Sequence, residues 1–289
     1  MPEGPRYVGR FAPSPTGHLH FGSLLAALAS WLRARTCGGE WLVRMEDIDP
    51  PRERAGASAH ILQTLSTFGL ESDRPVLYQS QRHTPYREAL ARLAAGGLAF
   101  PCWCSRGDLG AATHRGRCLS RRDAAAPPAW RLLVPDLEIA FVDGVFGRQS
   151  QQVGKEIGDF VLWRREDLPA YHLAVVVDDA VQGVTEVVRG ADLLDSTPRQ
   201  ILLQRLLALP TPSYMHIPLA LDAGGSKLSK QSLAAALDPA AVCAQLRKAL
   251  AFLGQPVASF DADTVQALLT QAAAAFDPLR IPVRLGFAV

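Results

Sequence analysis

The chain alternates short apolar runs with stretches in which apolar residues recur at the helical period. Runs rich in β-branched and aromatic residues predict buried strands at residues 7–11, 41–45, 76–79 and 159–163. Apolar positions three or four residues apart predict helices at residues 22–35, 53–68, 82–95 and 195–207. Two further apolar runs, at 173–177 and 215–221, continue the alternation. Strands that alternate with helices favour a parallel sheet covered by helices, which is the α/β class.

The alternation is interrupted once and then stops. From about residue 98 to 154 the chain carries a cysteine cluster, a polar, proline-rich stretch and a hairpin signal at Asp143-Gly144. After Gln231 only helical patterns remain, for example at 239–253 and 262–276. These changes predict four parts, which are residues 1–97, 98–154, 155–235 and 236–289. The second part is an insertion between two halves of one α/β domain, and the fourth is a short helical C-terminal region.

The first predicted strand and helix are joined by a tight loop suited to binding an anion. Pro13, Pro15 and Gly17 break the strand, and the helix begins near Gly22. A helix start directs backbone N–H groups and the positive end of its dipole at one point, which suits a phosphate. Gly22 lets a nucleotide approach the backbone, and His20 can donate a hydrogen bond to it. The alternative is an ordinary strand-to-helix turn with a surface histidine.

Four residues in the insertion have the spacing of a metal site. Cys102 and Cys104 are followed by His114 and Cys118, and three thiolates with one imidazole suit tetrahedral zinc. The alternative is a group of cytosolic thiols that bind no metal. The total of five cysteines is odd, which argues against a disulfide framework. Cys37 and Cys243 lack ligand-spaced neighbours and are expected to be small buried apolar residues.

Composition favours a cytoplasmic protein that does not enter a membrane. The chain has 289 residues, 48% hydrophobic content and a formal net charge of +2. It has no apolar run long enough to span a bilayer and no recognisable signal peptide. Arginine clusters such as Arg164/Arg165 can meet phosphates, although solvated surface is the commoner role for such clusters. The charge balance alone is too mild to establish nucleic-acid binding.

Two segments far apart in the sequence resemble the ATP-handling signatures of class I aminoacyl-tRNA synthetases. His20-Phe-Gly-Ser23 resembles the "HIGH" element, and Lys227-Leu-Ser-Lys-Gln231 resembles the "KMSKS" loop. Residues 44–52, 169–179, 188–192 and 197–200 resemble segments of the glutamate-specific branch. The match runs from Tyr7 to about Gln231, apart from the insertion. It implies a Rossmann-like catalytic domain in two halves.

The resemblance also implies which residues bind the substrates. The expected glutamate contacts are Arg10, Phe11, Ala12, Pro13, Ser14, Glu46, Tyr171 and Arg189. The expected ATP contacts are His20, Gly22, Lys227 and Lys230, of which His20 and Lys230 are the expected catalytic residues. Two arginines and one carboxylate suit glutamate, which carries two carboxylates and one ammonium. For any one of these residues taken singly, a structural ion pair or a core tyrosine is the alternative.

The chain departs from a full glutamyl-tRNA synthetase and resembles a smaller paralogous family, the glutamyl-Q tRNA(Asp) synthetases. Only a short stretch follows Lys230, where the full enzyme carries a long helical region that reads the anticodon. The smaller family often has tyrosine at the third metal position, so His114 is a departure that should strengthen zinc binding.

This second resemblance implies a function. The expected activity uses ATP with Mg²⁺ to activate L-glutamate and transfers it to the queuosine base in the anticodon of tRNA(Asp). The expected protein is a cytoplasmic monomer that binds Zn²⁺. The alternatives are a truncated glutamyl-tRNA synthetase and a non-catalytic RNA-binding paralogue. The paralogue should have lost His20 or Lys230, and both residues are present.

Overall fold

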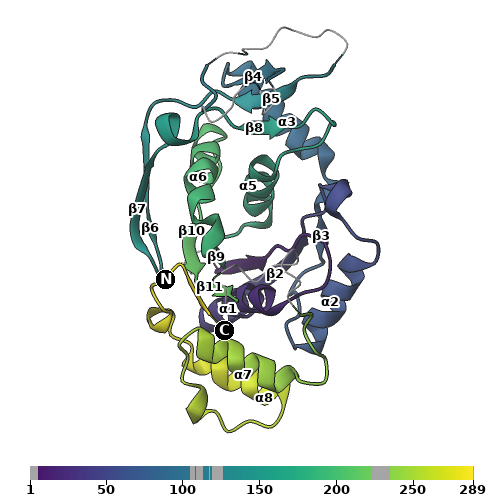
Figure 1. Ribbon diagram of the computed structural model, residues 1–289, viewed down its shortest axis with the longest axis vertical. Coiled ribbons are helices and arrows are strands. Elements are labelled where there is room, and N and C mark those ends of the chain that lie inside the picture. The colour runs from purple at the N-terminus through teal and green to yellow at the C-terminus, as the bar shows by residue number, and fades with distance from the viewer. Residues whose placement is uncertain are drawn as a thin grey trace.

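The computed structural model describes residues 6–104, 108, 113–116, 118, 126–222, 225 and 235–288. The molecule is elongated, with a central layered region between two smaller parts (Figure 1). One end carries a small sheet, and the other carries two helices, α7 and α8. Among the described residues, no helix is long and apolar enough to cross a membrane.

The first half of the central region is a parallel sheet in the order β1-β2-β3. Its strands are β1 (Val8–Phe11), β2 (Glu40–Met45) and β3 (Leu77–Tyr78). Nearly every residue of β1 and β2 is buried, as in a parallel sheet covered on both faces. Successive residues of β2 face different cores: Trp41 packs into one apolar cluster and Leu42 packs into the other.

The second half is a four-stranded sheet in the order β7-β6-β10-β9. Its strands are β6 (Glu138–Asp143), β7 (Gly147–Gln152), β9 (Glu186–Gly190) and β10 (Ser213–Ile217). The backbone N–H of Thr185, just before β9, donates to the Val8 carbonyl over 2.9 Å, so the two sheets meet at β1. Strands β6 and β7 form an antiparallel hairpin, which confirms the turn signal at Asp143-Gly144.

Helices cover both faces of these sheets. The α-helices are α1 (Phe21–Thr36), α2 (Ala57–Thr67), α3 (His83–Ala95), α5 (Tyr171–Gln182), α6 (Thr197–Leu206), α7 (Val242–Phe252) and α8 (Val265–Ala275). Apolar residues of α1, α2, α7 and α8 share one core, whereas α3, α5 and α6 share the other. Shorter helical turns are η1 (Pro50–Arg52), η2 (Gln79–Gln81), η3 (Val153–Ile157), η4 (Ala191–Ser196), η6 (Val257–Ser259) and η7 (Pro278–Arg280).

A third, antiparallel sheet lies at the end of the molecule opposite α7 and α8 (Figure 1). Its strands, in the order β4-β5-β8, are β4 (Ala99–Cys102), β5 (Ala129–Leu132) and β8 (Val161–Trp163). Strands on both sides of residue 154, the predicted end of the insertion, pair with each other. Strand β8 pairs with β5 of the predicted insertion, and β6 of the insertion pairs with β10. The division at 1–97, 98–154, 155–235 and 236–289 stays a prediction.

Three expectations from the sequence need correction or refinement. The apolar run 173–177 lies within helix α5. All five of its residues are buried, so the run shows no helical period that would distinguish it from a buried strand. Helices are not the only elements after Gln231, since β12 (Gly286–Ala288) pairs in parallel with β11 (Leu219–Leu221). A three-residue strand is too short to show a period. Cys37 is exposed and Cys243 is half-buried, so neither is fully buried as expected.

Candidate functional site

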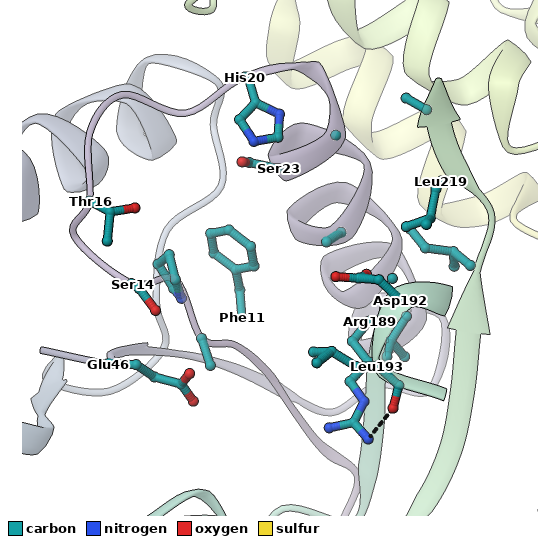
Figure 2. A pocket seen from close by; sticks show the side chains of 18 of the residues that line it. Phe11, Ser14, Thr16, His20, Ser23, Glu46, Arg189, Asp192, Leu193 and Leu219 are labelled. Atoms are coloured by element: carbon teal, nitrogen blue, oxygen red, sulfur yellow. Dashed lines mark hydrogen bonds between the residues drawn. The ribbon is translucent and has the colours of Figure 1, made fainter. Parts of the chain in front are cut away.

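A cavity of about 560 Å³ opens where β1, β2 and β9 end and α1 begins (Figure 2). Ligand sites in open α/β sheets lie at this carboxyl edge, because the loops there face a common crevice. The pocket brings together ten residues that the sequence singled out. These are Arg10, Phe11, Ala12, Pro13, Ser14, His20, Gly22, Glu46, Tyr171 and Arg189. Lys227 and Lys230, the other two expected ATP contacts, lie outside the described residues.

The pocket is also lined by residues that the sequence did not name as individual contacts, although some of them lie within the motifs at 20–23, 44–52 and 188–192. These residues are Thr16, Ser23, Ala26, Arg52, Val188, Gly190, Asp192, Leu193, Ile217, Pro218, Leu219 and Ala220. Residues 217–220 belong to the apolar run 215–221, which the sequence predicts only as part of the α/β core. An apolar run that supplies both core and pocket residues has the same hydrophobic pattern as one that supplies core residues alone, so the pattern does not indicate a binding role.

Arg189, near the end of β9, is a buried cation whose hydrogen-bond partners among the described residues are all neutral. Its side chain donates to Gln200 Oε1 over 2.8 Å, Thr197 Oγ1 over 2.8 Å and the Leu193 carbonyl over 3.2 Å. Its Nε donates to His216 Nε2 over 3.0 Å. Among the described residues, no carboxylate lies within ion-pair distance of Arg189, which is only 5% exposed. A buried guanidinium with neutral partners makes this part of the pocket favourable to an anion.

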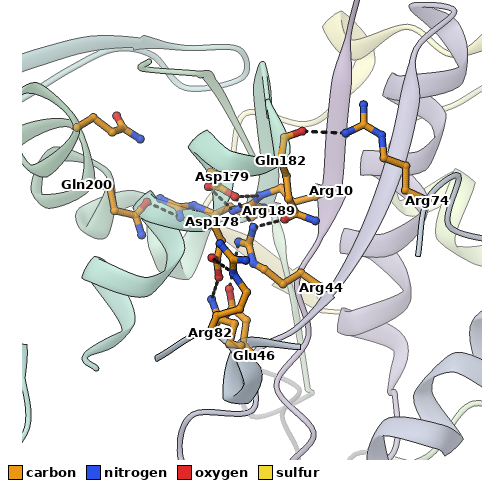
Figure 3. A network of polar contacts seen from close by, with 12 residues as sticks. Arg10, Arg44, Glu46, Arg74, Arg82, Asp178, Asp179, Gln182, Arg189 and Gln200 are labelled. Carbon is orange, nitrogen blue, oxygen red and sulfur yellow. Dashed lines mark hydrogen bonds and ion pairs between the residues drawn. The ribbon is translucent and has the colours of Figure 1, made fainter. Parts of the chain in front are cut away.

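Two other pocket residues, Arg10 and Glu46, belong to a buried cluster of charges that also contains Arg44 and Asp179 (Figure 3). Arg10 Nε and Arg44 Nη1 both bind Asp179 Oδ1, at 3.2 and 2.7 Å, and Arg44 Nη2 lies 3.4 Å from Glu46 Oε1. Burial raises the pKa of Glu46, although Arg44 and Arg10 oppose the rise. Burial would likewise raise the pKa of Asp179, but Arg10 and Arg44 hold it below its ordinary value.

Glu46 and Tyr171 add two further polar groups to the lining of the pocket. The backbone N–H of Glu46 donates to the Pro13 carbonyl over 3.0 Å, which ties the end of β2 to the loop after β1. Tyr171 is the first residue of α5, and burial raises its phenol pKa, so it keeps its proton. The expected glutamate contacts therefore offer two arginines, one carboxylate and one phenol to a ligand, and Arg52 and Asp192 add one further charge of each sign to the lining.

Helix α1 presents its N-terminus to the same pocket. His20 precedes the helix, and both Gly22 and Ser23 of its first turn line the cavity. The first turn contains no acidic residue and receives no side-chain cap at His20. Its backbone N–H groups and dipole therefore suit an anionic ligand at this end of the pocket.

A second group of polar residues lies in the small sheet. The Sγ atoms of Cys102, Cys104 and Cys118 lie within 4.8 Å of one another. His114 Nε2 lies 3.3 Å from Cys102 Sγ, and the backbone N–H of Trp103 donates to Cys118 Sγ over 3.1 Å. Burial raises the pKa of the Cys102 thiol to about 11. The structure thus clusters the three predicted cysteines and places the fourth predicted ligand, His114, beside Cys102.

Asp159, which the sequence did not single out, holds His114 in this cluster. Asp159 Oδ2 lies 2.9 Å from His114 Nδ1 and accepts the Gly116 N–H, while Oδ1 accepts the Val134 N–H. With Nδ1 held by a carboxylate, Nε2 of His114 is directed at Cys102. Carboxylates hold metal-binding histidines in this way.

Comparison with known proteins identifies the family of the chain and agrees with the fold. Residues 7–129 and 120–251 match the family described as tRNA synthetases class I (E and Q), catalytic domain. The chain is 52% identical over 288 residues to the glutamyl-Q tRNA(Asp) synthetase of Neisseria meningitidis serogroup C, covering 96% of this chain and 97% of the relative. It is 54% identical over 281 residues to that of Xanthomonas oryzae pv. oryzae, covering 96% and 93%.

A solved structure shows the same fold. The glutamate-tRNA synthetase of Elizabethkingia anophelis superposes with a TM-score of 0.82 at 22% identity, covering 98% of this chain and 68% of that one. The sequence matches, which span nearly the whole chain at about half identity, decide the family and the enzyme class. The chain therefore belongs to the class I tRNA synthetases, within the family of glutamyl-Q tRNA(Asp) synthetases, and is a ligase.

Proposed function

We propose that the protein activates L-glutamate with ATP and Mg²⁺ and transfers it to the queuosine base in the anticodon of tRNA(Asp). The observation that carries the first half is Arg189, a buried cation in the pocket with neutral partners only. The names of relatives about half identical to the chain support the second half. We further propose that it works as a monomer in the cytoplasm.

The charges of the pocket favour glutamate over its close analogues. Arg10 and Arg189 would bind the two carboxylates, and Glu46 would bind the ammonium. Glutamine lacks the second anion, so one buried arginine would keep no charged partner. Aspartate is shorter by one methylene and would not reach both arginines. In either case the cost of leaving a buried charged group unpaired opposes binding.

The N-terminus of α1 would hold the phosphates of ATP, with His20 as a donor. In the proposed reaction an oxygen of the glutamate α-carboxylate attacks the α-phosphorus of ATP. The new O–P bond forms as the bond to pyrophosphate breaks. The protein supplies position and charge, and the sequence motif assigns Lys230, supported by Lys227, to the phosphates. Mg²⁺ carried on ATP would share that charge.

In the proposed second step a hydroxyl of the queuosine cyclopentene diol attacks the carbonyl carbon of the adenylate. The C–O ester bond forms, AMP leaves, and the hydroxyl proton passes to solvent or to the leaving phosphate. The cis-diol of this ring resembles the terminal ribose diol that glutamyl-tRNA synthetases esterify. An ordinary synthetase activity at the 3′ end is the alternative, and the position of the glutamate on the RNA distinguishes the two.

The test is to locate labelled glutamate on RNA. We expect label to accumulate on tRNA(Asp) that carries queuosine and to stay at background on the same transcript without it. The label should survive removal of the 3′ terminal adenosine, because the ester would be in the anticodon. Glutamate-dependent pyrophosphate exchange, measured alongside, reports activation separately. Efficient charging of unmodified tRNA(Glu) at its 3′ end would contradict the queuosine assignment and leave glutamate activation intact.

We also propose that Cys102, Cys104, His114 and Cys118 hold one structural Zn²⁺. Three clustered thiols and an imidazole fit its tetrahedral preference, and four protein ligands leave no position for a substrate. When bound, the ion would cross-link β4 to the segment that carries His114 and Cys118. Zinc binds the thiolates and must displace the thiol protons, so its binding should weaken as the pH falls.

We expect about one zinc per chain in protein never exposed to chelator. Replacing Cys118 with serine should remove the metal and lower Tm by about 5–10 °C, which corresponds to about 2–3 kcal/mol in a protein of this size. Metal content by mass spectrometry and Tm by scanning calorimetry check both. Cys37→Ser is the matched control, because Cys37 is exposed and lies outside the cluster. Wild-type protein without zinc would contradict the site.

A further inference from the structure

The buried pair Asp143 and His216 lies directly behind Arg189. His216 on β10 and Asp143 at the end of β6 are 0% and 2% exposed, so neither can contact solvent or a large ligand. His216 Nδ1 lies 2.6 Å from Asp143 Oδ2, and His216 Nε2 lies 3.0 Å from Arg189 Nε. Neither residue lines the pocket. The three side chains form one hydrogen-bonded chain that ends at the cavity.

The partners of His216 determine its tautomer. A guanidinium can only donate, so His216 Nε2 must carry a lone pair where it meets Arg189. The proton of the neutral ring then lies on Nδ1 and is donated to Asp143. Burial lowers the pKa of His216, which keeps the ring neutral. Asp143 therefore selects the one tautomer that can accept from Arg189.

Asp143 is itself fixed by the backbone of its hairpin. Its Oδ1 accepts the N–H groups of Val145 and Phe146 over 3.0 and 2.9 Å, and its Oδ2 accepts that of His216 over 3.1 Å. Burial would raise the pKa of Asp143, but the hydrogen bonds from His216 and the hairpin hold it below its ordinary value. The turn between β6 and β7 thus places a permanent anion two hydrogen bonds away from Arg189.

We propose that Asp143 and His216 are positioning residues that orient Arg189 while leaving its charge available to a substrate carboxylate. A carboxylate bound directly to Arg189 would neutralise it, as Asp179 does for Arg10 and Arg44. An imidazole between the two accepts the Nε–H and fixes the plane of the guanidinium without adding a charge. The pair would therefore set affinity for the amino acid. The inference rests on the proposed function, because it requires Arg189 to bind the amino acid.

The experiment compares three variants by glutamate-dependent pyrophosphate exchange and by calorimetric titration with glutamate. Asp143→Asn keeps the size of the side chain, but its amide would donate to His216 Nδ1 and place the ring proton on Nε2, facing the Arg189 Nε–H. His216→Asn carries an amide near the position of Nδ1 and loses the acceptor for Arg189. His216→Gln carries an amide oxygen near the position of Nε2 and can accept from Arg189.

We expect Asp143→Asn and His216→Asn to raise the KM and Kd for glutamate by about tenfold to a hundredfold, as loss of an outer hydrogen-bond partner does at other sites. The kcat at saturating glutamate and the KM for ATP should stay within about threefold of wild type. His216→Gln should recover most of the affinity. Val142→Thr, at an exposed neighbour of Asp143, is the control for the hairpin.

Wild-type affinity for glutamate in Asp143→Asn would overturn the proposal. So would an equal loss in His216→Gln and His216→Asn, since a purely structural histidine would not distinguish them. If Asp143→Asn does not fold, the two His216 variants decide the question. Wild-type protein that binds no glutamate would refute the proposed function itself, whereas wild-type binding with unaffected variants would refute only the positioning role.

Discussion

Replacing Arg189 with glutamine is expected to lower kcat/KM for glutamate by about a thousandfold. Loss of one member of a buried charge pair typically costs 2–5 kcal/mol, and a thousandfold corresponds to about 4 kcal/mol. The loss should be large here because no carboxylate of the described chain shares the charge of Arg189. The substrate carboxylate would then have to leave water for a neutral site.

The same variant should lose discrimination as well as rate. Glutamine lacks the second anion, so the low kcat/KM for glutamine should change far less in Arg189→Gln than the kcat/KM for glutamate. Pyrophosphate exchange with each amino acid gives the two kcat/KM values. Arg205→Gln is the matched control, because Arg205 is exposed on α6 and lies outside the pocket. A preference for glutamate that survives in Arg189→Gln would assign the second carboxylate to another group.

The family resemblance, together with one local strand–loop–helix pattern, named residues that line a single pocket. The strand, loop and helix start at residues 8–36 are local structure, and proline and glycine mark their boundaries. The expected substrate contacts from Arg10 to Arg189 all line one cavity, because β1, β2 and β9 end at the same edge. Hydrophobic patterning thus defined the α/β class, and the topology of such sheets brought the motifs together.

Partners far apart in sequence could not be predicted in this way. Asp179 lies 169 residues from Arg10, and its role in neutralising two arginines depends on how α5 packs against β1. Asp143 and His216 each lie at a strand position that patterning treats only as buried or exposed. A buried polar residue in an apolar run is a signal that something must satisfy it, but the sequence does not say what. Asp159 escaped prediction for the same reason.

The difference between Arg10 and Arg189 gives the pocket two unlike cationic walls. Arg10 shares Asp179 with Arg44, so its charge is partly compensated, and directional hydrogen bonding is a larger part of what it offers a ligand. Within the part of the chain that the structure describes, Arg189 has only neutral partners and contributes uncompensated charge. A zwitterionic amino acid with a neutral side chain has one carboxylate and could bind only one of the two arginines. An amino acid with a second carboxylate can satisfy both, and its ammonium then needs an anion.

Glu46 is the anion that we expect to meet that ammonium, and Glu46→Gln should lower kcat/KM for glutamate by about a hundredfold. Glu46 lines the pocket from the end of β2 and is 9% exposed (Figure 2). Among the described residues its one ion-pair partner is Arg44, at the long distance of 3.4 Å, so the carboxylate can still act on a ligand. A hydrogen bond to a charged group contributes about 1.5–3 kcal/mol, which corresponds to a change of about tenfold to somewhat more than a hundredfold in kcat/KM.

Inhibition by glutarate distinguishes a direct contact between Glu46 and the ammonium from a structural role of Glu46. Glutarate has both carboxylates of glutamate but no ammonium, so its inhibition constant should change by less than about threefold in Glu46→Gln. Arg189→Gln should instead weaken glutamate and glutarate alike. Competitive inhibition of pyrophosphate exchange measures both ligands in the same assay. Equal weakening of glutamate and glutarate by Glu46→Gln would mean that Glu46 shapes the pocket through Arg44, and the ammonium would then belong to a different acceptor.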